Sequence, residues 1–400
     1  MSLIKFRYLR RKRMLTLILI LTLTSALFSV TAYSFLGFYN GFTNYVGEQK
    51  DIIAIYSKTG STPFTGVIPI QFANKITSID GIIAISTETI APTIINGQSI
   101  FIRGIIPQEL TKLNPLTIVE GQTLNITDTN SAIIGKNLAD KLHLKTGDSF
   151  LAFSVLSKCY VEMQIKGVFE SASSLNDEAL VPLYVGQWLR GLSYNDVTFI
   201  RAKIDLTLTN ANQIYQEITN QTAPSPSNSA PPSPTPKSET QRELEALIPL
   251  AQTNIDIGSI GIEQSQQFMQ NYLDRYGISR DALIVLSIVV LFFASGTAIC
   301  AITLFIKQHS SDIDILRSIG VTSKNIKIDL TLKMITWALI ATALGTVISA
   351  VAITVFQRLG YLQVLSHTIS FQLDPLIIAA NFILLSVLIG IDIARTELKQ

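Results

Sequence analysis

Four long stretches without charged residues constrain this chain most strongly. They cover residues 14–36, 282–306, 334–357 and 375–391 and contain no Asp, Glu, Lys, Arg or His. A helix needs about 20 apolar residues to cross the hydrocarbon core of a bilayer. The first three stretches exceed that length, and the fourth, with 17 residues, is at the short limit. We therefore predict a membrane protein with four transmembrane helices.

The first stretch has an alternative interpretation as a cleaved signal peptide, because a basic segment precedes it. Its apolar part is longer than the roughly 7–15 residues of a signal-peptide core, and no small-x-small cleavage site follows it. We therefore favour a retained helix.

Lys and Arg near the ends of the spans predict the orientation. The tail 1–13 carries six of them and no acid, and the loop 307–333 carries five, whereas the loop 358–374 carries only Arg358. We expect both tails, 1–13 and 392–400, and the loop 307–333 to be cytoplasmic, in a plasma or inner membrane. A nucleic-acid partner is not expected, because the net charge is only +2 and the basic tail adjoins a span.

The region between the first two spans is predicted to be extracytoplasmic. Residues 37–204 alternate short strand-like and helix-like runs, with Asn96-Gly97 as a hairpin turn, so we predict an α+β domain. Residues 205–240 are interpreted as a mobile Pro/Ser-rich insertion, because residues 223–238 hold six of the 14 prolines. Residues 241–281 are predicted to form a helical stalk, with a helix over Glu263–Tyr276 that continues into the second span.

No chemistry-bearing motif accompanies this architecture. His143, His309 and His367 are predicted on separate loops, and no cluster has metal-ligand spacing. Neither a G-x-S-x-G elbow nor a phosphate-binding G-x-x-x-x-G-K-[ST] loop is present. The adjacent acids Asp177 and Glu178 are interpreted as a solvated loop pair. We expect no catalytic, metal or cofactor-binding residues, so any energy source must be a partner.

Two kinds of helix surface remain as candidate interaction sites. In the loop 307–333, apolar residues at Ile313, Leu316 and Ile319 predict a short amphipathic helix that ends at Gly320. It either lies on the lipid surface or docks on a soluble partner. In the spans, small residues form faces at Ala341, Gly345 and Ser349 and at Gly296, which serve either packing within the chain or a dimer interface.

The loop sequence resembles a known family. Residues 312–326 are similar to the pattern E-I-G-x-L-R-A-x-G-A-S-x-x-x-I of FtsX/MacB/LolC-like permeases, and residues 102–107 and 133–148 resemble parts of the family's extracytoplasmic domain. The family also has the same order of segments, with one span, then a large outer domain, then three further spans. The sequence departs from the pattern with Asp312 for Glu, Asp314 for Gly, and Lys333 where an acid is common.

The resemblance implies the permease subunit of an ABC transporter, working as a homodimer or with a related permease. A separate cytoplasmic ATPase would bind ATP and drive motion of the outer domain, for export, lipoprotein release or activation of a wall hydrolase. The implied ATPase-coupling residues are Asp312, Ile313, Ile315, Leu316, Arg317 and Gly320. Ile313 and Leu316 would supply the apolar contact with the ATPase. The alternative function is an ATP-independent, membrane-anchored surface protein that binds an extracytoplasmic partner.

Overall fold

The computed structural model describes residues 11–222, 257–369 and 373–395, and the chain divides into two compact units. The membrane unit comprises residues up to 42 and from 273 onward, and the inserted domain comprises residues 43–272. Residues 1–10 and 396–400 of the two tails lie outside the described residues. So do residues 223–256, which include the second half of the predicted insertion and the start of the predicted stalk.

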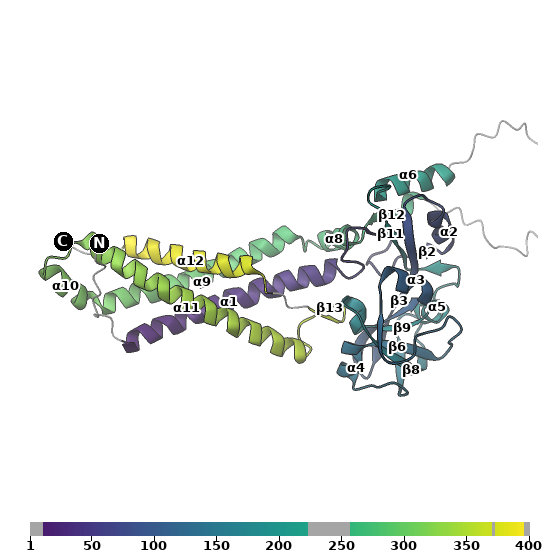
Figure 1. Ribbon diagram of the computed structural model, residues 1–400, viewed down its shortest axis with the longest axis horizontal. Helices are drawn as coiled ribbons and strands as arrows, with labels where there is room; N and C mark the ends of the chain where they lie inside the picture. Colours follow the sequence, from purple (N-terminus) through teal and green to yellow (C-terminus); the bar gives the residue numbers. More distant parts are fainter. Residues whose placement is uncertain (1–10, 223–256, 370–372, 396–400) are drawn as a thin grey trace, which may run out of the picture. The chain divides into compact units, whose positions relative to one another are not determined.

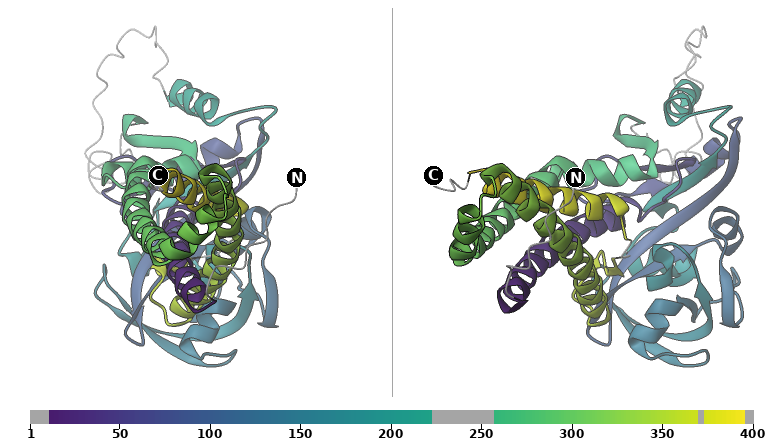
Figure 2. Two further views of the ribbon diagram at one scale, coloured as in Figure 1. Left: turned by 90° about the vertical axis from the view of Figure 1, so that its left-hand side faces the viewer. Right: turned by 60° about the vertical axis from the view of Figure 1, so that its left-hand side comes forward.

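Four helices of the membrane unit are long and apolar enough to cross a membrane: α1 (Arg11–Thr43), α9 (Arg280–Gln308), α11 (Ser323–Arg358) and α12 (Pro375–Arg395). A short helix, α10 (Ser310–Ser318), joins α9 to α11, and a hairpin of β13 (Gln363–Val364) and β14 (His367–Thr368) joins α11 to α12. Figures 1 and 2 show α9, α11 and α12 alongside one another. The described helices therefore confirm the four predicted spans.

Small and polar side chains hold α1 against its neighbours. The Asn381 amide of α12 donates hydrogen bonds to the hydroxyls of Ser25 and Ser29 at 2.8 and 3.0 Å. Gly345 of α11 packs so closely on α1 that an added Cβ would lie 2.7 Å from the Ser25 Cβ and 2.9 Å from the Ala26 nitrogen. Small residues permit such close approach of helices in a membrane. The face formed by Ala341, Gly345 and Ser349 is thus buried within the chain.

Gly296 lies in a different environment from this packed face. It is exposed on α9, and an added Cβ would meet no atom within 4 Å. Of the two interpretations of the small residues, the one of packing within the chain therefore applies to α11, while the structure leaves Gly296 without a packing role.

The inserted domain is built on one large mixed sheet with the strand order β12-β1-β11-β3-β4-β9-β6-β8-β5, while β7 pairs with β3 and β8. Its strands are β1 (Ile52–Ser57), β3 (Ile82–Ile95), β4 (Gln98–Ile105), β5 (Thr117–Gly121), β6 (Ser131–Gly135), β7 (Ser149–Ser154), β8 (Tyr160–Glu170), β9 (Ala179–Pro182), β11 (Phe199–Ile204) and β12 (Ile260–Gln264). A separate pair is formed by β2 (Ile68–Pro69) and β10 (Asp196–Val197).

Short helices accompany the sheet (Figure 1). They are α2 (Gln71–Thr77), α3 (Pro107–Leu113), α4 (Lys136–Leu142), α5 (Leu183–Arg190), α6 (Ala211–Thr222), α8 (Ser265–Arg275) and the 3-10 turns η1 (Ser174–Asp177) and η2 (Ile257–Ser259). Two large apolar clusters form its core. One joins α2 and α6 to β1 and β11, and the other joins α4 and α5 to β4, β6 and β9. The predicted α+β architecture is confirmed.

The hairpin predicted at Asn96-Gly97 is also present. Ile95 of β3 pairs with Gln98 of β4, and both turn residues have positive φ angles of 50° and 76°. The Asn-Gly pair adopts these angles readily, so it fixes the register of the longest strand pair in the domain.

Two predicted boundaries are wrong. The insertion was placed from residue 205, but residues 211–222 form α6, which buries Ile214 and Ile218 in the core. The second helix of the stalk was predicted to begin at Glu263, but Glu263 belongs to β12, which pairs with β1. The helix that follows, α8, ends at Arg275, and Gly277 has a φ angle of 71°, so it does not continue into α9. The strand β12 forms one edge of the sheet, and its pairing with β1 cannot be read from its local sequence.

We predict that Gly345→Ala destabilises the membrane unit by about 1–3 kcal/mol, because its Cβ would overlap the backbone of α1. Gly296→Ala is the matched control, since its Cβ enters open space. Thermal unfolding of the two variants in the same detergent measures the difference. Equal unfolding temperatures would contradict the packing of α11 on α1.

Candidate functional site

The helix α10 carries the residues that the sequence singled out for contact with a partner. It begins after His309, whose ring packs on Phe305 with centroids 4.4 Å apart and whose Nδ1 lies 2.9 Å from the Phe305 carbonyl oxygen. It ends at Ser318, two residues before the predicted end at Gly320, and Gly320 has a φ angle of 95° in the turn that follows. The Arg317 guanidinium donates a hydrogen bond of 3.0 Å to the Ser323 hydroxyl at the start of α11. Both ends of α10 are thus tied to the neighbouring helices.

The structure corrects the face of α10 that is available to a partner. Ile313 and Leu316 were expected to supply the apolar docking contact, but only 2% and 6% of their surfaces are exposed. Both belong to the apolar cluster that α9, α11 and α12 form with α1. The helical period that predicted an amphipathic helix was right, but the apolar face packs on the chain itself.

A second apolar pair lies on the outward face of α10. Ile315 is 58% exposed and Ile319 is 71% exposed, and the polar residues Asp314 and Ser318 flank them on the same face. Residues four apart are neighbours on a helix surface, so the two isoleucines form one small apolar patch. We call Ile315 and Ile319 the outward pair. Asp312 is half-buried and Gly320 is exposed.

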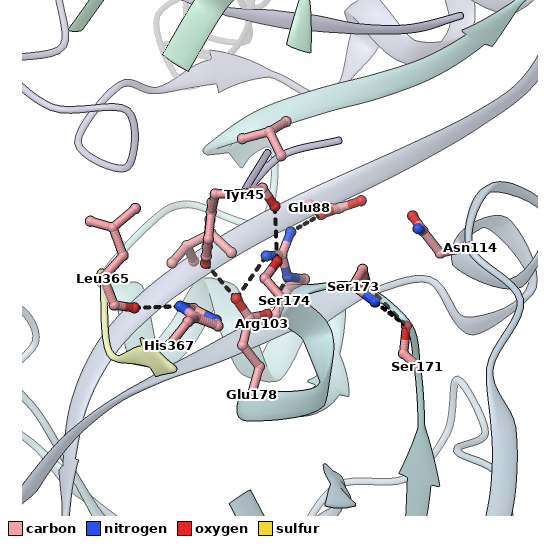
Figure 3. A network of polar contacts seen from close by, with 12 residues as sticks. Tyr45, Glu88, Arg103, Asn114, Ser171, Ser173, Ser174, Glu178, Leu365 and His367 are labelled. Carbon is pink, nitrogen blue, oxygen red and sulfur yellow. Dashed lines mark hydrogen bonds and ion pairs between the residues drawn. The ribbon is translucent and has the colours of Figure 1, made fainter. Parts of the chain in front are cut away.

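A row of four buried charges crosses the centre of the inserted domain, and Figure 3 shows three of them, Glu88, Arg103 and Glu178. Arg201 lies on β11, Glu88 on β3, Arg103 on β4, and Glu178 directly before β9, and these four strands are consecutive neighbours in the sheet. The strand register places the side chains of Arg201, Glu88 and Arg103 on one face. We call these four residues the charge row. Its signs alternate, so its net charge is zero.

Short ion pairs connect each member of the charge row to the next. Arg201 Nε donates to Glu88 at 2.6 Å, and Arg103 Nη1 donates to the other Glu88 oxygen at 2.5 Å. Arg103 also holds Glu178 with two parallel hydrogen bonds, from Nε at 2.5 Å and from Nη2 at 2.8 Å. Paired in this way, the four groups are almost fully buried.

The two residues that close the charge row come from the segment just after α1. The Tyr45 hydroxyl donates to Glu178, and the Tyr45 ring lies 5.2 Å from the Arg103 guanidinium carbon. The Val46 carbonyl oxygen accepts a 2.8 Å hydrogen bond from Arg201 Nη1, which also donates to the Asn114 side chain. Tyr45 and Val46 therefore contact opposite ends of the charge row.

The buried setting shifts the pKa values of these groups. Burial alone would raise the pKa of Glu88, but Arg201 and Arg103 lower it below its ordinary value. Burial and the neighbouring Glu178 carboxylate raise the pKa of the Tyr45 phenol well above its ordinary value. At neutral pH the carboxylate of Glu88 is charged and the phenol keeps its proton for Glu178.

The charge row contradicts the interpretation of Asp177 and Glu178 as a solvated pair, and it contains two arginines that the sequence analysis did not single out. Asp177 and Glu178 were interpreted as solvated, but both are buried. Arg103 is the only charged residue in the strand sequence IFIRGI, and Arg201 lies between apolar residues in FIRAKI, where Lys203 is the one other charge. An isolated charge in a buried strand needs an opposite partner, and that pattern was the available signal. Among the described residues, no group of three or more His, Cys, Asp or Glu is arranged to hold a metal.

We predict that Glu178→Gln destabilises the inserted domain by about 3–5 kcal/mol, because it leaves a buried guanidinium without its counter-charge. The control is Glu170→Gln, whose carboxylate pairs with Lys136 at 3.5 Å on the surface and should cost less than about 1 kcal/mol. Trp188 fluorescence during urea unfolding, in a Trp337→Phe background, reports on this domain. A similar loss in both variants would argue against the structural importance of the charge row.

The lowered pKa of Glu88 predicts the pH dependence of stability. A carboxylate whose folded pKa is depressed stabilises the fold above its unfolded pKa, and this contribution is lost as pH falls through the folded value. Thermal stability should therefore decline only below about pH 4.3, the ordinary Glu value. The measurement belongs in a Glu109→Gln background, because burial raises the pKa of Glu109 and its titration has the opposite sign. A decline that begins near pH 6 would contradict this assignment.

Comparison with protein families accounts for both units. Residues 16–224 match the MacB-like periplasmic core domain, and residues 284–395 match the FtsX-like permease C-terminal domain. The first match alone spans more than half of the 400 residues. A comparison with curated protein sequences found no match.

Three solved structures are similar to parts of the chain. The periplasmic region of MacB from Actinobacillus actinomycetemcomitans is 13% identical, with 55% of this chain and 92% of that chain covered and a TM-score of 0.34. The extracellular domain of the noncanonic ABC-type transporter YknZ from Gram-positive bacteria is 18% identical, with 42% and 88% covered and a TM-score of 0.32. A domain of a permease protein, described as putative, from Porphyromonas gingivalis is 14% identical, with 43% and 82% covered and a TM-score of 0.30.

The family matches cover the four-helix membrane unit and the α+β domain inserted between its first two spans, in the order that the sequence resemblance implied. The inserted domain is therefore extracytoplasmic, and the chain belongs to the FtsX/MacB-like family of ABC transporter permeases.

Proposed function

We propose that this chain is the permease subunit of an ABC complex and transmits ATP-driven motion of a partner ATPase to the extracytoplasmic domain. Family membership supports the class of complex. The observation that carries the transmission role is the packing of α10, whose Ile313 and Leu316 belong to one apolar cluster with the four long helices. A force applied to α10 would therefore act on the whole membrane unit.

The topology supports contact with a cytoplasmic partner. With an extracytoplasmic domain between the first and second spans, the loop between the second and third spans reaches the opposite side of the membrane. In the proposed orientation α10 and both tails are cytoplasmic, and the excess of Lys and Arg in the loop 307–333 supports this orientation. The outward pair, Ile315 and Ile319, then faces the side on which an ATPase is found.

ATP is bound by the partner in this proposal. The sequence has no phosphate-binding loop, and its four apolar stretches contain no Asp, Glu, Lys, Arg or His that would serve as an ion or proton relay. We therefore assign the chain no catalytic activity or cofactor of its own. The complex contains two ATPase copies and a second permease, either identical or related. Export, lipoprotein release and activation of a wall hydrolase are the three outcomes of the motion that fit the family.

Capture of the tagged protein from its native membrane tests the proposal. Peptide identification should recover an ABC ATPase, and the double variant Ile315→Asp, Ile319→Asp should lose it, because two charges would enter an apolar contact. Loss of more than tenfold in recovered ATPase is expected, since two buried isoleucines contribute about 1.5–3 kcal/mol each.

The matched control is Leu359→Asp, which places the same charge on an exposed leucine beyond the other end of α11. It should retain the ATPase. Recovery of extracytoplasmic proteins without any ATPase would instead favour the membrane-anchored binding protein. Leu316→Asp differs from the outward pair, because it introduces a charge into the chain's own core and should reduce stability.

A further inference from the structure

We propose that Tyr45 and Val46 form a clamp through which α1 acts on the centre of the extracytoplasmic sheet. They are the second and third residues after the end of α1, so displacement of this helix reaches them through one intervening residue, Asn44. The charge row is the structure that they hold. The existence of the clamp is a property of the domain alone, whereas its use in transmission rests on the proposed function.

The clamp reaches both ends of the charge row. Tyr45 contacts Glu178 at the β9 end of the charge row, and Val46 contacts Arg201 at the β11 end. Between these ends lie Glu88 of β3 and Arg103 of β4, each bound to both neighbours. Two adjacent residues therefore engage four consecutive strands through one chain of ion pairs. Figure 3 shows the part of this chain that runs from Tyr45 through Glu178 and Arg103 to Glu88.

Further contacts from η1 and from two phenylalanine rings hold Tyr45 in place. The Ser174 hydroxyl of η1 donates a 3.0 Å hydrogen bond to the Tyr45 carbonyl oxygen. The Tyr45 ring packs edge-on against Phe64, with centroids 5.0 Å apart, and Phe64 packs on Phe101 of β4 at 5.3 Å. Tyr45 and Val46 are themselves buried. Tyr45 is thus held by its hydroxyl, its ring and its backbone carbonyl.

The other chain connection of the domain is built differently. Phe268 and Tyr272 of α8 pack on Tyr56 of the edge-proximal strand β1, with the Phe268 and Tyr56 centroids 4.1 Å apart. The chain then turns at Gly277, which has a φ angle of 71° and open space where a Cβ would lie. This return connection engages one side of the sheet and ends in a glycine turn. Of the two connections, the one after α1 contacts the central strands.

A buried row of paired charges suits the transmission of motion, because separating any one pair costs a large free energy. Moving one member away leaves its neighbour charged and unpaired in a low-dielectric interior, which is strongly unfavourable. A small displacement of Tyr45 or Val46 is therefore resisted or passed on to the next strand. An apolar contact would slide more easily, because it is non-directional.

Amide hydrogen exchange of the full-length protein in lipid nanodiscs tests the clamp. The variant Tyr45→Phe removes one hydroxyl that donates to Glu178 and leaves the ring in place. We expect exchange to rise about tenfold in peptides from β3, β4, β9 and β11, the factor that corresponds to a lost hydrogen bond to a charged group.

The matched control is Tyr56→Phe, which also removes a hydroxyl bound to a glutamate, here Glu263 of β12 at 2.9 Å. Its effect should stay within β1 and β12. A milder second variant, Ser174→Ala, removes only the hydrogen bond to the Tyr45 carbonyl and should show the four-strand pattern at smaller amplitude. It preserves the test if Tyr45→Phe does not fold.

An increase confined to residues around 45–47, or a four-strand pattern of equal size in the Tyr56→Phe control, would overturn the proposal. Because the exchange experiment uses the permease alone, its outcome does not depend on an ATPase. Failure to capture an ATPase would leave a positive exchange result intact and would count only against the proposed function.

Discussion

Two guanidinium groups and two carboxylates are removed from water at the centre of the extracytoplasmic sheet, and the rest of the domain is arranged around this constraint. Such burial is tolerated only when every charge has a partner with good geometry. Arg103 meets the requirement with bonds to both Glu88 and Glu178. The strands that carry these groups must therefore keep their register, since a shift by one residue would move each charge to the other face.

The membrane unit meets a different requirement, because its helices must associate without a hydrophobic driving force between them. Close approach at Gly345 and the Asn381 hydrogen bonds to Ser25 and Ser29 bind α1 to α11 and α12. The short helix α10 joins the same cluster through Ile313 and Leu316. A unit packed in this way is suited to moving as one body, which is what transmission from one side of a membrane to the other requires.

Sequence patterns predicted what depends on local composition. Uncharged stretches predicted the spans, Asn96-Gly97 predicted a hairpin, and Gly320 predicted the end of α10 to within two residues. Tertiary pairing decided the rest. The helical period of apolar residues predicts that a helix has an apolar face, but it does not identify what that face packs against. Leu316 was therefore assigned to an ATPase, although it packs on the chain itself. Glu178 was taken as solvated, because its partner Arg103 is 75 residues away.

The central claim is that ATP-driven motion reaches the extracytoplasmic domain, and one distance measurement tests it most directly. The measurement uses a spin label at Tyr194→Cys, an exposed position in that domain, in a chain with Cys159 and Cys300 replaced by Ser. If the proposed complex holds two copies of this permease with an ATPase, the label gives one distance between the copies. The account predicts that the distance distribution changes between the ATP-bound and ADP-bound states. Identical distributions, in a complex that hydrolyses ATP, would contradict it.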